Sequence, residues 1–292
     1  MTGIVIVDKP AGWTSFDVAA KLRGLFHERR IGHGGTLDPM ATGVLPLFLG
    51  RATRAVPYFE EDADKEYIAG LRLGLETDTE DTTGRVLAQW DVAATRSDLE
   101  AALARMVGPQ MQTPPMYSAV QINGQRLYQL ARQGKTVERP ARPVTFYELE
   151  LLEGEGADYL IRVRCSRGTY VRTLCAQLGQ MLGCGGCMSS LRRTAAGRFS
   201  IHQAVPLQTL LEAADPAALV QPVDVLFAAY PAVTVADEAE RRLRCGNALP
   251  AALLSGPLPL GRCRIYGADG AFLALGEGQD GQLVSLKSFF EV

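Results

Sequence analysis

The sequence contains no apolar run that approaches the roughly 18 residues of a membrane-spanning helix, which excludes a bundle of membrane helices. Its first residues, Met1 to Asp8, have no basic stretch and too short an apolar run for a secretory signal. It also has no internal repeat of fixed period and no low-complexity tract. We therefore expect a cytoplasmic protein whose cysteines are free thiols.

The common metal-binding side chains are scarce, with three histidines and six cysteines in 292 residues. Cys184 and Cys187 have the spacing of half a zinc site, but no second pair follows and no histidine is near. The acidic turn at 77–84 lacks the ligand spacing and the central glycine of a calcium loop. We expect no metal site.

The chain also lacks the overall positive charge of many nucleic-acid-binding proteins, because its formal net charge is -2. Its charges are nevertheless segregated. There is no acidic residue between Asp158 and Glu212, while seven arginines lie there: Arg162, Arg164, Arg167, Arg172, Arg192, Arg193 and Arg198. A second basic run is Arg126, Arg132, Lys135, Arg139 and Arg142, with Glu138 among them. This pattern predicts a face for a polyanion; the alternative is a set of solvated faces that do not converge.

Hydrophobic residues make up 47% of the chain and charged residues 21%, which is typical of a globular protein with a large core. Apolar and β-branched patterns predict strands at 3–7, 65–74, 144–152 and 159–165. Helices are expected after an N-cap at Thr14 or Ser15, at 51–59, and after a capping box at 97–100. The stretch 168–182 predicts a turn followed by a helix, with Met181 facing inward. Asn123-Gly124 predicts a hairpin after 117–122.

The chain changes character near 226–231. Beyond this break, short apolar runs alternate with Gly and Pro turns, at 253–260, 263–266, 271–275 and 283–290. This alternation predicts a small β-barrel.

One loop, from Gly32 to Pro46, is too rich in Gly and Pro for a helix or a central strand. Asp38 precedes Pro39, whose ring biases the aspartate toward an extended backbone and so places its carboxylate on a rigid piece of loop. The glycines before it allow close approach of a ligand. The alternative is a structural turn in which Asp38 caps a neighbouring amide.

The loop resembles the catalytic loop of the bacterial tRNA pseudouridine-55 synthases, the TruB family. It matches every fixed position of that family's Gly-His-x-Gly-Thr-Leu-Asp-Pro-x-Ala-Thr-Gly-Val-Leu-Pro. Asp8 to Ser15 matches the family's Asp-Lys-Pro-x-Gly-x-Thr-Ser. Four more stretches follow in the family's order: Lys65-Glu66-Tyr67 with 73–74 and 77–81, then 112–119, 165–172, and Leu191-Arg192-Arg193 with Gly197 and Phe199.

The resemblance implies an α/β (α+β) protein with the pseudouridine-synthase fold: a mixed, largely antiparallel central sheet with flanking helices, and a small C-terminal β-barrel of PUA type. The implied domains are a catalytic one at 1–229 and an RNA-binding one at 230–292. The implied reaction isomerises uridine 55 in the T-arm loop of tRNA by base flipping, without a cofactor. The implied partner is the T-arm stem-loop of tRNA, with no membrane and no obligate protein partner, and the protein is expected to be a monomer.

The resemblance also implies the site. Asp38 is the expected nucleophile and Arg172 the cation that keeps it ionised; the alternative for Arg172 is a phosphate contact. Tyr67 would stack on the flipped uracil and bring a hydroxyl to the reacting carbon, or else it is an ordinary strand tyrosine. The expected substrate-binding residues are His33, Tyr170, Leu191, Lys9 and Arg192. Leu191 and Tyr170 would wall the pocket, His33 would hold or displace the extruded nucleotide, and Lys9 would support the loop. The alternatives are that Leu191 and Tyr170 are ordinary core residues. His33 would then be a loop histidine bonded to nearby backbone, and Lys9 a surface lysine.

The motif segments bring no second carboxylate to the expected pocket, which favours rearrangement over hydrolysis, since a glycosidase uses two carboxylates. Two other functions are compatible with the sequence: a pseudouridine synthase acting on other RNA, and an RNA-binding or tRNA-folding factor. The Asp38 loop favours the enzyme, because binding alone does not require a buried acid.

Overall fold

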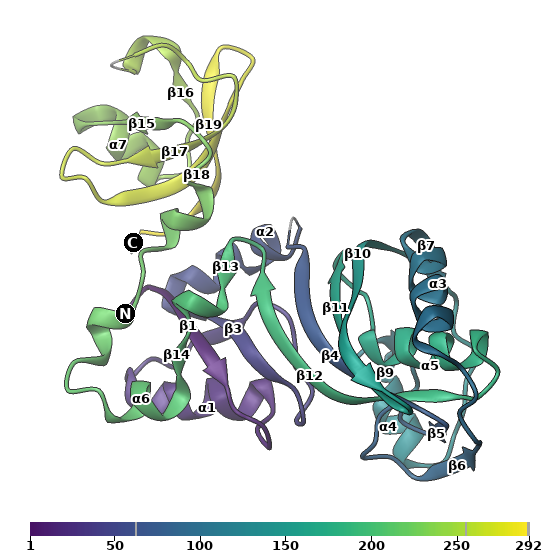
Figure 1. Ribbon diagram of the computed structural model, residues 1–292. Helices are drawn as coiled ribbons and strands as arrows, with labels where there is room; N and C mark the ends of the chain where they lie inside the picture. Colours follow the sequence, from purple (N-terminus) through teal and green to yellow (C-terminus); the bar gives the residue numbers. More distant parts are fainter. Residues whose placement is uncertain (62, 255, 291–292) are drawn as a thin grey trace.

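The computed structural model describes residues 1–61, 63–254 and 256–290. Its largest element is a ten-stranded sheet with the order β14-β1-β3-β12-β4-β11-β10-β7, to which β2 and β13 add at β3 and β12 (Figure 1). The strands are β1 Gly3–Lys9, β2 Ile31–His33, β3 Thr42–Leu49, β4 Lys65–Leu73, β7 Gly108–Gln112, β10 Arg142–Glu155, β11 Asp158–Cys165, β12 Gly186–Ala196, β13 Phe199–Ser200 and β14 Val205–Pro206. Only β1–β14 and β3–β12 are parallel among its pairs, so the predicted mixed, largely antiparallel sheet is confirmed.

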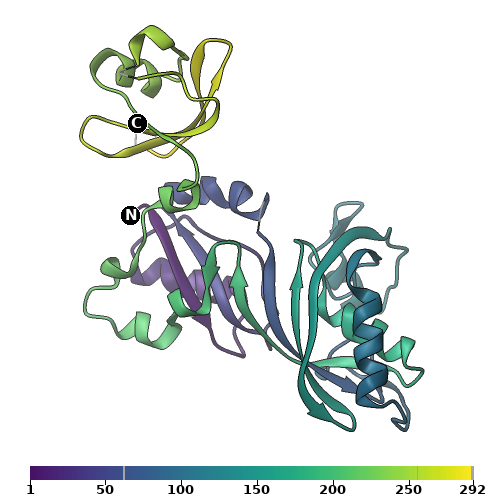
Figure 2. The same ribbon diagram turned by 45° about the horizontal axis from the view of Figure 1, so that its top comes forward.

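Helices flank both halves of this sheet. They are α1 Ser15–Leu25, α2 Val56–Glu61, α3 Arg96–Met106, α4 Leu127–Arg132, α5 Val171–Met181 and α6 Leu207–Glu212. Figure 2 shows α1 beside the N-terminal half, and α3 and α5 beside the other half. No helix in the described part of the chain is long and apolar enough to cross a bilayer.

Local sequence explains where the helices begin. Thr14 caps α1 by accepting a hydrogen bond from the Asp17 amide, and Asp17 accepts one in return from the Thr14 amide. The capping box predicted at 97–100 is wrong by two residues: α3 begins at Arg96, so its box joins Thr95 and Asp98. The helix predicted at 51–59 begins as the 3-10 helix η1 Gly50–Ala55 before α2.

Met181, expected inward, is 37% exposed because it lies on the outer side of the last turn of α5. The Asn123-Gly124 hairpin joins β8 Gln121–Ile122 to β9 Gln125–Arg126, and both turn residues have positive φ. The strand expected from 117 is therefore limited to its last two residues. A further small ribbon pairs β5 Leu75–Thr77 with β6 Val86–Gln89.

Successive residues of β1 enter two different cores, because side chains alternate across a strand. Val5 and Val7 join a core with α1, α3 and α5. Ile4 and Ile6 join a second core on the opposite face, which includes Phe48. Both faces of the N-terminal half of the sheet are therefore covered.

A second, five-stranded sheet has the order β15-β17-β18-β19-β16. Its elements are β15 Ala232–Thr234, α7 Asp237–Arg244, β16 Leu249–Pro250, β17 Gly261–Tyr266, β18 Phe272–Gln279 and β19 Gln282–Ser288. It fits the PUA-like β domain predicted for the tail. The apolar run at 253–260, which contributed to the barrel prediction, does not form a strand: its described residues are the end of the 3-10 helix η5 Ala251–Leu253 and a loop, and Leu260 is 98% exposed.

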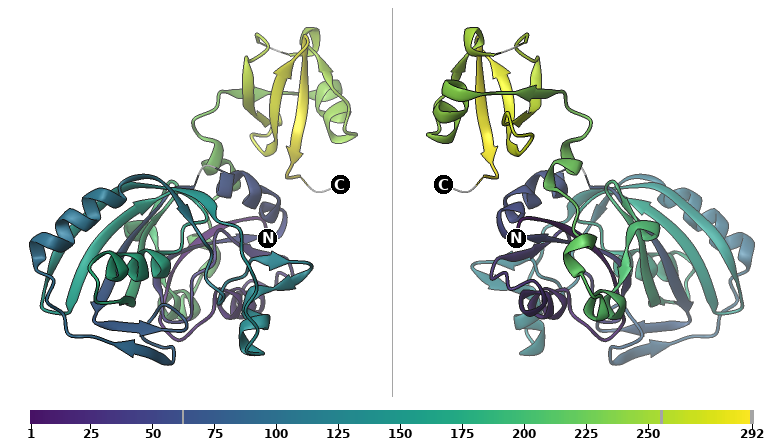
Figure 3. Two further views of the ribbon diagram at one scale, coloured as in Figure 1. Left: turned by 90° about the vertical axis from the view of Figure 1, so that its right-hand side faces the viewer. Right: turned by 90° about the vertical axis from the view of Figure 1, so that its left-hand side faces the viewer.

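The second sheet stands beyond the α2 side of the first (Figure 3) and contacts it through an aromatic cluster. Phe227, in the 3-10 helix η4 Val223–Phe227, packs on Phe272 and Phe289 of the second sheet. The Tyr266 hydroxyl donates to Asp224 at 2.6 Å. The core that begins at Ile4 and Ile6 continues into the second sheet through Leu275 and Phe289.

Candidate active site

The loop that carries Asp38 connects β2 to β3 and is fastened to the turn between β1 and α1. The expectation that the whole stretch 32–46 lies outside the central strands is wrong, because residues 42–46 begin β3, which pairs with β1 and β12 despite its Gly and Pro. The Gly12 amide donates to the Pro39 carbonyl at 2.8 Å. The Leu37 amide donates to Ser15 Oγ at 2.8 Å, and that hydroxyl donates back to the Leu37 carbonyl at 3.2 Å. These bonds fix the backbone on both sides of Asp38.

Lys9 lies beneath this junction and is fully buried. Its Nζ donates to the carbonyls of Pro10, Trp13 and Pro39 at 2.9, 2.7 and 3.4 Å. Burial lowers its pKa to about 8, and the nearby Asp38 carboxylate opposes that fall. The structure thus places Lys9 against the Asp38 loop and not on the surface.

Arg172, in the first turn of α5, meets Asp38 from the other side of the site. Its Nε lies 3.0 Å from Asp38 Oδ2, and its side chain is 6% exposed. Its Nη1 and Nη2 donate to the carbonyls of Thr79 at 3.0 Å and Tyr117 at 2.9 Å. The guanidinium therefore has a fixed orientation when it meets the carboxylate.

Asp81 is a second carboxylate at the site, with Oδ2 3.7 Å from Arg172 Nη1. The expectation that the motif segments bring no second carboxylate to the pocket is therefore wrong, because the 77–84 turn folds back onto α5. The other oxygen of Asp81 accepts hydrogen bonds from the Thr79 hydroxyl and the Thr83 amide, both at 2.9 Å. Asp81 is 5% exposed and lies next to Nη1 of Arg172, whereas Asp38 lies next to Nε.

Burial raises the pKa of Asp38 above its ordinary value, while Arg172 opposes the rise, Asp81 adds to it and Lys9 opposes it. The side chain keeps 36% exposure. Asp38 is thus a partly desolvated carboxylate beside an oriented cation, as a nucleophile requires.

Tyr67 and Leu191 line the same core as Leu37, on the neighbouring strands β4 and β12. Tyr67 is 6% exposed and Leu191 is 9% exposed. Burial raises the pKa of Tyr67 to about 12, and the Arg193 guanidinium opposes this rise. The hydroxyl is therefore protonated at neutral pH.

The remaining expected residues surround this centre at different depths. Tyr170 is the N-cap residue of α5, two residues before Arg172. Its backbone amide donates to the Gln112 side chain at 2.8 Å, and its carbonyl accepts from that side chain at 3.1 Å. His33 ends β2, is partly buried, and has a pKa lowered by burial. Arg192 points away from the core and pairs with Asp8 at 2.7 Å.

Two residues that the structure places in the site were quoted in motifs but given no role: Asp81 and Arg193. The signal that separates Arg193 from its neighbour is strand alternation. Arg193 lies directly opposite buried Tyr67 in the β12–β4 pairing, whereas Arg192 lies opposite Ile68. Gln112, 2% exposed, was quoted in a motif too.

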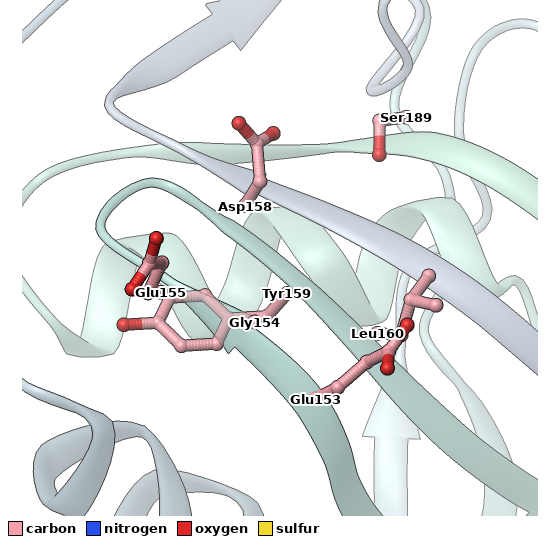
Figure 4. Close-up of a pocket in the computed structure, with 7 residues that line it drawn as sticks. All are labelled: Glu153, Gly154, Glu155, Asp158, Tyr159, Leu160 and Ser189. Carbon is pink, nitrogen blue, oxygen red and sulfur yellow. The ribbon is translucent and has the colours of Figure 1, made fainter.

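A separate hollow of about 460 Å³ lies at the far ends of β10 and β11 (Figure 4). Its lining is Glu153, Gly154, Glu155, Asp158, Tyr159, Leu160 and Ser189. Three carboxylates and no cation make it unsuited to a polyanion, and it contains none of the residues around Asp38.

Ion pairs neutralise part of the basic stretch at 162–198. Arg162 pairs with Glu150, Arg164 with Asp64 at 3.8 Å, and Arg192 with Asp8. The seven arginines therefore do not form one free face. In the second basic run, Arg126, Arg132, Lys135, Arg139 and Arg142 have no carboxylate within 4.0 Å in the described residues.

Two family models match the chain. One, described as TruB family pseudouridylate synthase (N terminal domain), matches residues 23–171. The other, described as tRNA pseudouridylate synthase B C-terminal domain, matches residues 172–228. They meet inside α5, so they divide the sequence within one sheet and its helices and not at the second sheet.

Similar proteins cover almost the whole chain. A protein of Synechococcus sp. named tRNA pseudouridine synthase B is 44% identical over 94% of this chain and 93% of its own length. One of the same name from Aromatoleum aromaticum is 46% identical over 94% and 88%. A chain in the crystal structure of a Cbf5-Nop10-Gar1 complex superposes with a TM-score of 0.72 at 27% identity, covering 99% of this chain and 85% of that one.

Proposed function

The chain belongs to the TruB family of pseudouridine synthases and isomerises uridine in tRNA to pseudouridine, and from this premise we propose that it acts on uridine 55 of the T-arm loop with Asp38 as nucleophile. The observation that carries the proposal is the ion pair between Asp38 and Arg172, 3.0 Å apart at the end of a rigid loop. The domains proposed for this task are a catalytic one at 1–229 and an RNA-binding one at 230–292.

The reaction breaks the bond between N1 of uracil and C1′ of ribose, turns the base, and joins C5 to C1′. A proton leaves C5 and N1 gains one, so no oxidant or reductant is needed. Asp38 can form a covalent bond to the base or to the sugar carbon, which divides the change into two easier steps. Arg172 keeps the carboxylate ionised where burial favours the neutral acid.

The uridine must leave its stack to reach Asp38. Tyr67 and Leu191, both buried near the loop, would enclose the flipped uracil, with Tyr170 at the rim. The Tyr67 hydroxyl would handle the C5 proton. His33 would hold the place that the nucleotide leaves, Lys9 would support the loop through the Pro39 carbonyl, and Arg192 would contact the RNA near the entrance.

The unpaired cations at 126–142 are the proposed contact for the T-arm stem-loop. This segment is joined to the site, since Tyr117 accepts a hydrogen bond from Arg172 at 2.9 Å and the Tyr128 amide donates to the Ser118 carbonyl at 3.1 Å. Backbone phosphates would position the stem while the pocket selects the base. We propose that the protein acts as a monomer in the cytoplasm without a protein partner; its six free cysteines fit a reducing compartment.

The test is incubation with an unmodified tRNA transcript and mapping of pseudouridine along it. We expect one modification, at position 55, and none in a transcript with cytidine there. Asp38→Asn should abolish conversion, because an amide is a poor nucleophile, yet bind tRNA. Asp158→Asn, the same change in an exposed pair with Arg72, should convert normally.

The other outcomes decide between the alternatives. Pseudouridine at another position, or in another RNA alone, would replace the proposed site of action. Conversion by Asp38→Asn at the rate of the unchanged protein would remove Asp38 as the nucleophile. Tight tRNA binding without any conversion would favour a tRNA-folding factor.

A further inference from the structure

The largest fully buried side chain of the protein is that of Arg193, with no exposed surface. No carboxylate in the described residues lies within 4.0 Å of it. A guanidinium is costly to bury without a counter-charge, so its hydrogen bonds must compensate for the lost water. The contacts of the Arg193 side chain must therefore account for its burial.

Two of its three nitrogens hold the Asp38 loop. Nε donates to the Val44 carbonyl at 2.7 Å, and Nη2 donates to the Gly35 carbonyl at 3.1 Å. Gly35 precedes Asp38 and Val44 follows it, so one planar group fixes both arms of the loop. The third nitrogen, Nη1, is buried and has no hydrogen-bond partner among the residues that the structure describes.

Two polar side chains of β4 lie near this guanidinium, the cation Lys65 and the phenol Tyr67, and of these Tyr67 can accept a hydrogen bond from it. Arg193 and Tyr67 are direct cross-strand partners in the antiparallel β12–β4 pair, and both side chains are buried. Residues in that relation have adjacent Cβ atoms on one face of the sheet. The guanidinium opposes the rise of the Tyr67 pKa, as expected of a buried cation close to the phenol, while its Nη1 still has no hydrogen-bond partner in the described residues.

We propose that Arg193 is a positioning residue for the isomerisation, which orients the Tyr67 hydroxyl through its free Nη1 while its other nitrogens fix the Asp38 loop. One guanidinium thereby couples the positions of the nucleophile and of the hydroxyl that we assign to the C5 proton. The inference rests on the proposed role of Tyr67. A lysine cannot do the same, because a single ammonium does not reach three fixed acceptors in one plane.

A purely structural role for Arg193 makes a different prediction. If it only pins Gly35 and Val44, its replacement disturbs the loop whether or not Tyr67 carries a hydroxyl. If it also orients that hydroxyl, replacement costs more while the hydroxyl is present than after the hydroxyl has been removed. A double-mutant cycle separates the two cases.

The experiment measures the single-turnover rate of pseudouridine formation at saturating tRNA for the unchanged protein, Arg193→Lys, Tyr67→Phe and the double variant. We expect Arg193→Lys to slow the step at least about tenfold, since preorganised donors commonly contribute more than that. In the Tyr67→Phe background the same change should cost at least about threefold less than it does beside the intact hydroxyl, because only the loop contacts are then lost. Arg72→Lys, an exposed arginine on β4 paired with Asp158, is the matched control and should leave the rate unchanged.

An equal loss in both backgrounds would overturn the inference in favour of a structural pin. If Arg193→Lys does not fold, urea unfolding of Tyr67→Phe decides. Loss of the hydroxyl removes a partner of a buried cation, so the variant should unfold at lower urea; stability equal to that of the unchanged protein would refute the contact. Absence of conversion by the unchanged protein would instead refute the proposed function.

Discussion

Arg172 satisfies three kinds of acceptor at once: the Asp38 carboxylate, the carbonyls of Thr79 and Tyr117, and the more distant Asp81. Only a planar fork can do this with a fixed geometry. The residue thereby joins segments from four parts of the chain beside the Asp38 carboxylate.

Arg172→Lys should therefore lower the single-turnover rate by about 10²-fold, the usual cost of removing one preorganised donor, while tRNA affinity changes little. The measurement is rate and affinity on the same transcript. Arg162→Lys, in the exposed pair with Glu150, should be nearly normal. A near-normal rate for the Arg172 variant would assign this arginine to a phosphate contact.

The raised pKa of Asp38 predicts two opposite pH effects. The proposed nucleophilic role requires the ionised carboxylate, so activity should fall as pH drops through a pKa that lies above the ordinary aspartate value of about 4. This acid limb should be visible in single-turnover rates. The contribution of Asp38 to the free energy of unfolding should instead become less favourable as pH rises. Burial is the largest cause of the shift, so the folded protein binds the proton more tightly than the unfolded chain does, and the ionised form is disfavoured by folding.

Asp38→Asn should therefore be more stable than the unchanged protein at neutral pH, and this advantage should disappear as pH falls below the unfolded aspartate's pKa. Urea unfolding at neutral and at acid pH measures it. A variant that is less stable at neutral pH would show that the pair with Arg172 outweighs desolvation.

At the scale of elements, the Asp38 loop depends on the parallel contact between β3 and β12. Gly43 lies opposite Arg193 there, with a φ of +101°, and a Cβ would collide with the Arg193 carbonyl oxygen. Both a left-handed backbone and close approach of a strand require glycine at this position.

Gly43→Ala should destabilise the protein by more than the ~1–3 kcal/mol of backbone strain alone. Gly108→Ala is the matched control, since Gly108 has the same φ of +101° and nothing within 4 Å of its virtual Cβ. Urea unfolding should separate the two variants. Equal losses would show that β12 moves aside without cost.

At the scale of the whole molecule, the tail is not a basic arm. Residues 230–292 hold six Lys and Arg against seven Asp and Glu. Arg242 and Arg244 form ion pairs with glutamates of α7 itself. Arg262 pairs with Glu61 in α2, and Arg264 donates to the Tyr230 carbonyl at 3.0 Å. Arg241 and Lys287 are its two exposed cations without an ion pair in the described residues.

Replacing Arg241 and Lys287 together by Gln should therefore weaken tRNA binding. The slope of log K against the logarithm of the salt concentration should become shallower by about one to two, since each lost phosphate contact changes it by about 0.7–0.9. The rate at saturating tRNA should stay unchanged. Arg242→Gln, in a pair with Glu238, is the control with little effect. An unchanged slope in the double variant would show that the tail contacts no phosphate through these residues.

The sequence by itself determined the features that depend on near neighbours in the chain. The Gly and Pro of the Asp38 loop, the Thr14 cap of α1, the Asn123-Gly124 turn and the antiparallel pair β10–β11 follow from local backbone preferences and side-chain alternation. The prediction of the α3 capping box failed because two overlapping candidates, 95–98 and 97–100, both fit the pattern, and local propensity does not choose between them.

Only the tertiary structure decided which charged side chains form ion pairs or are buried and which stay accessible to a partner. Asp81 pairs with Arg172, and Arg193 is buried while Arg192 is only half-buried. Arg164 and Arg192 pair with Asp64 and Asp8, which are far away in the sequence. These outcomes depend on which strands become neighbours and on which face each side chain lies. A one-residue shift in register would exchange Arg192 with Arg193, and the chain alone does not state that register.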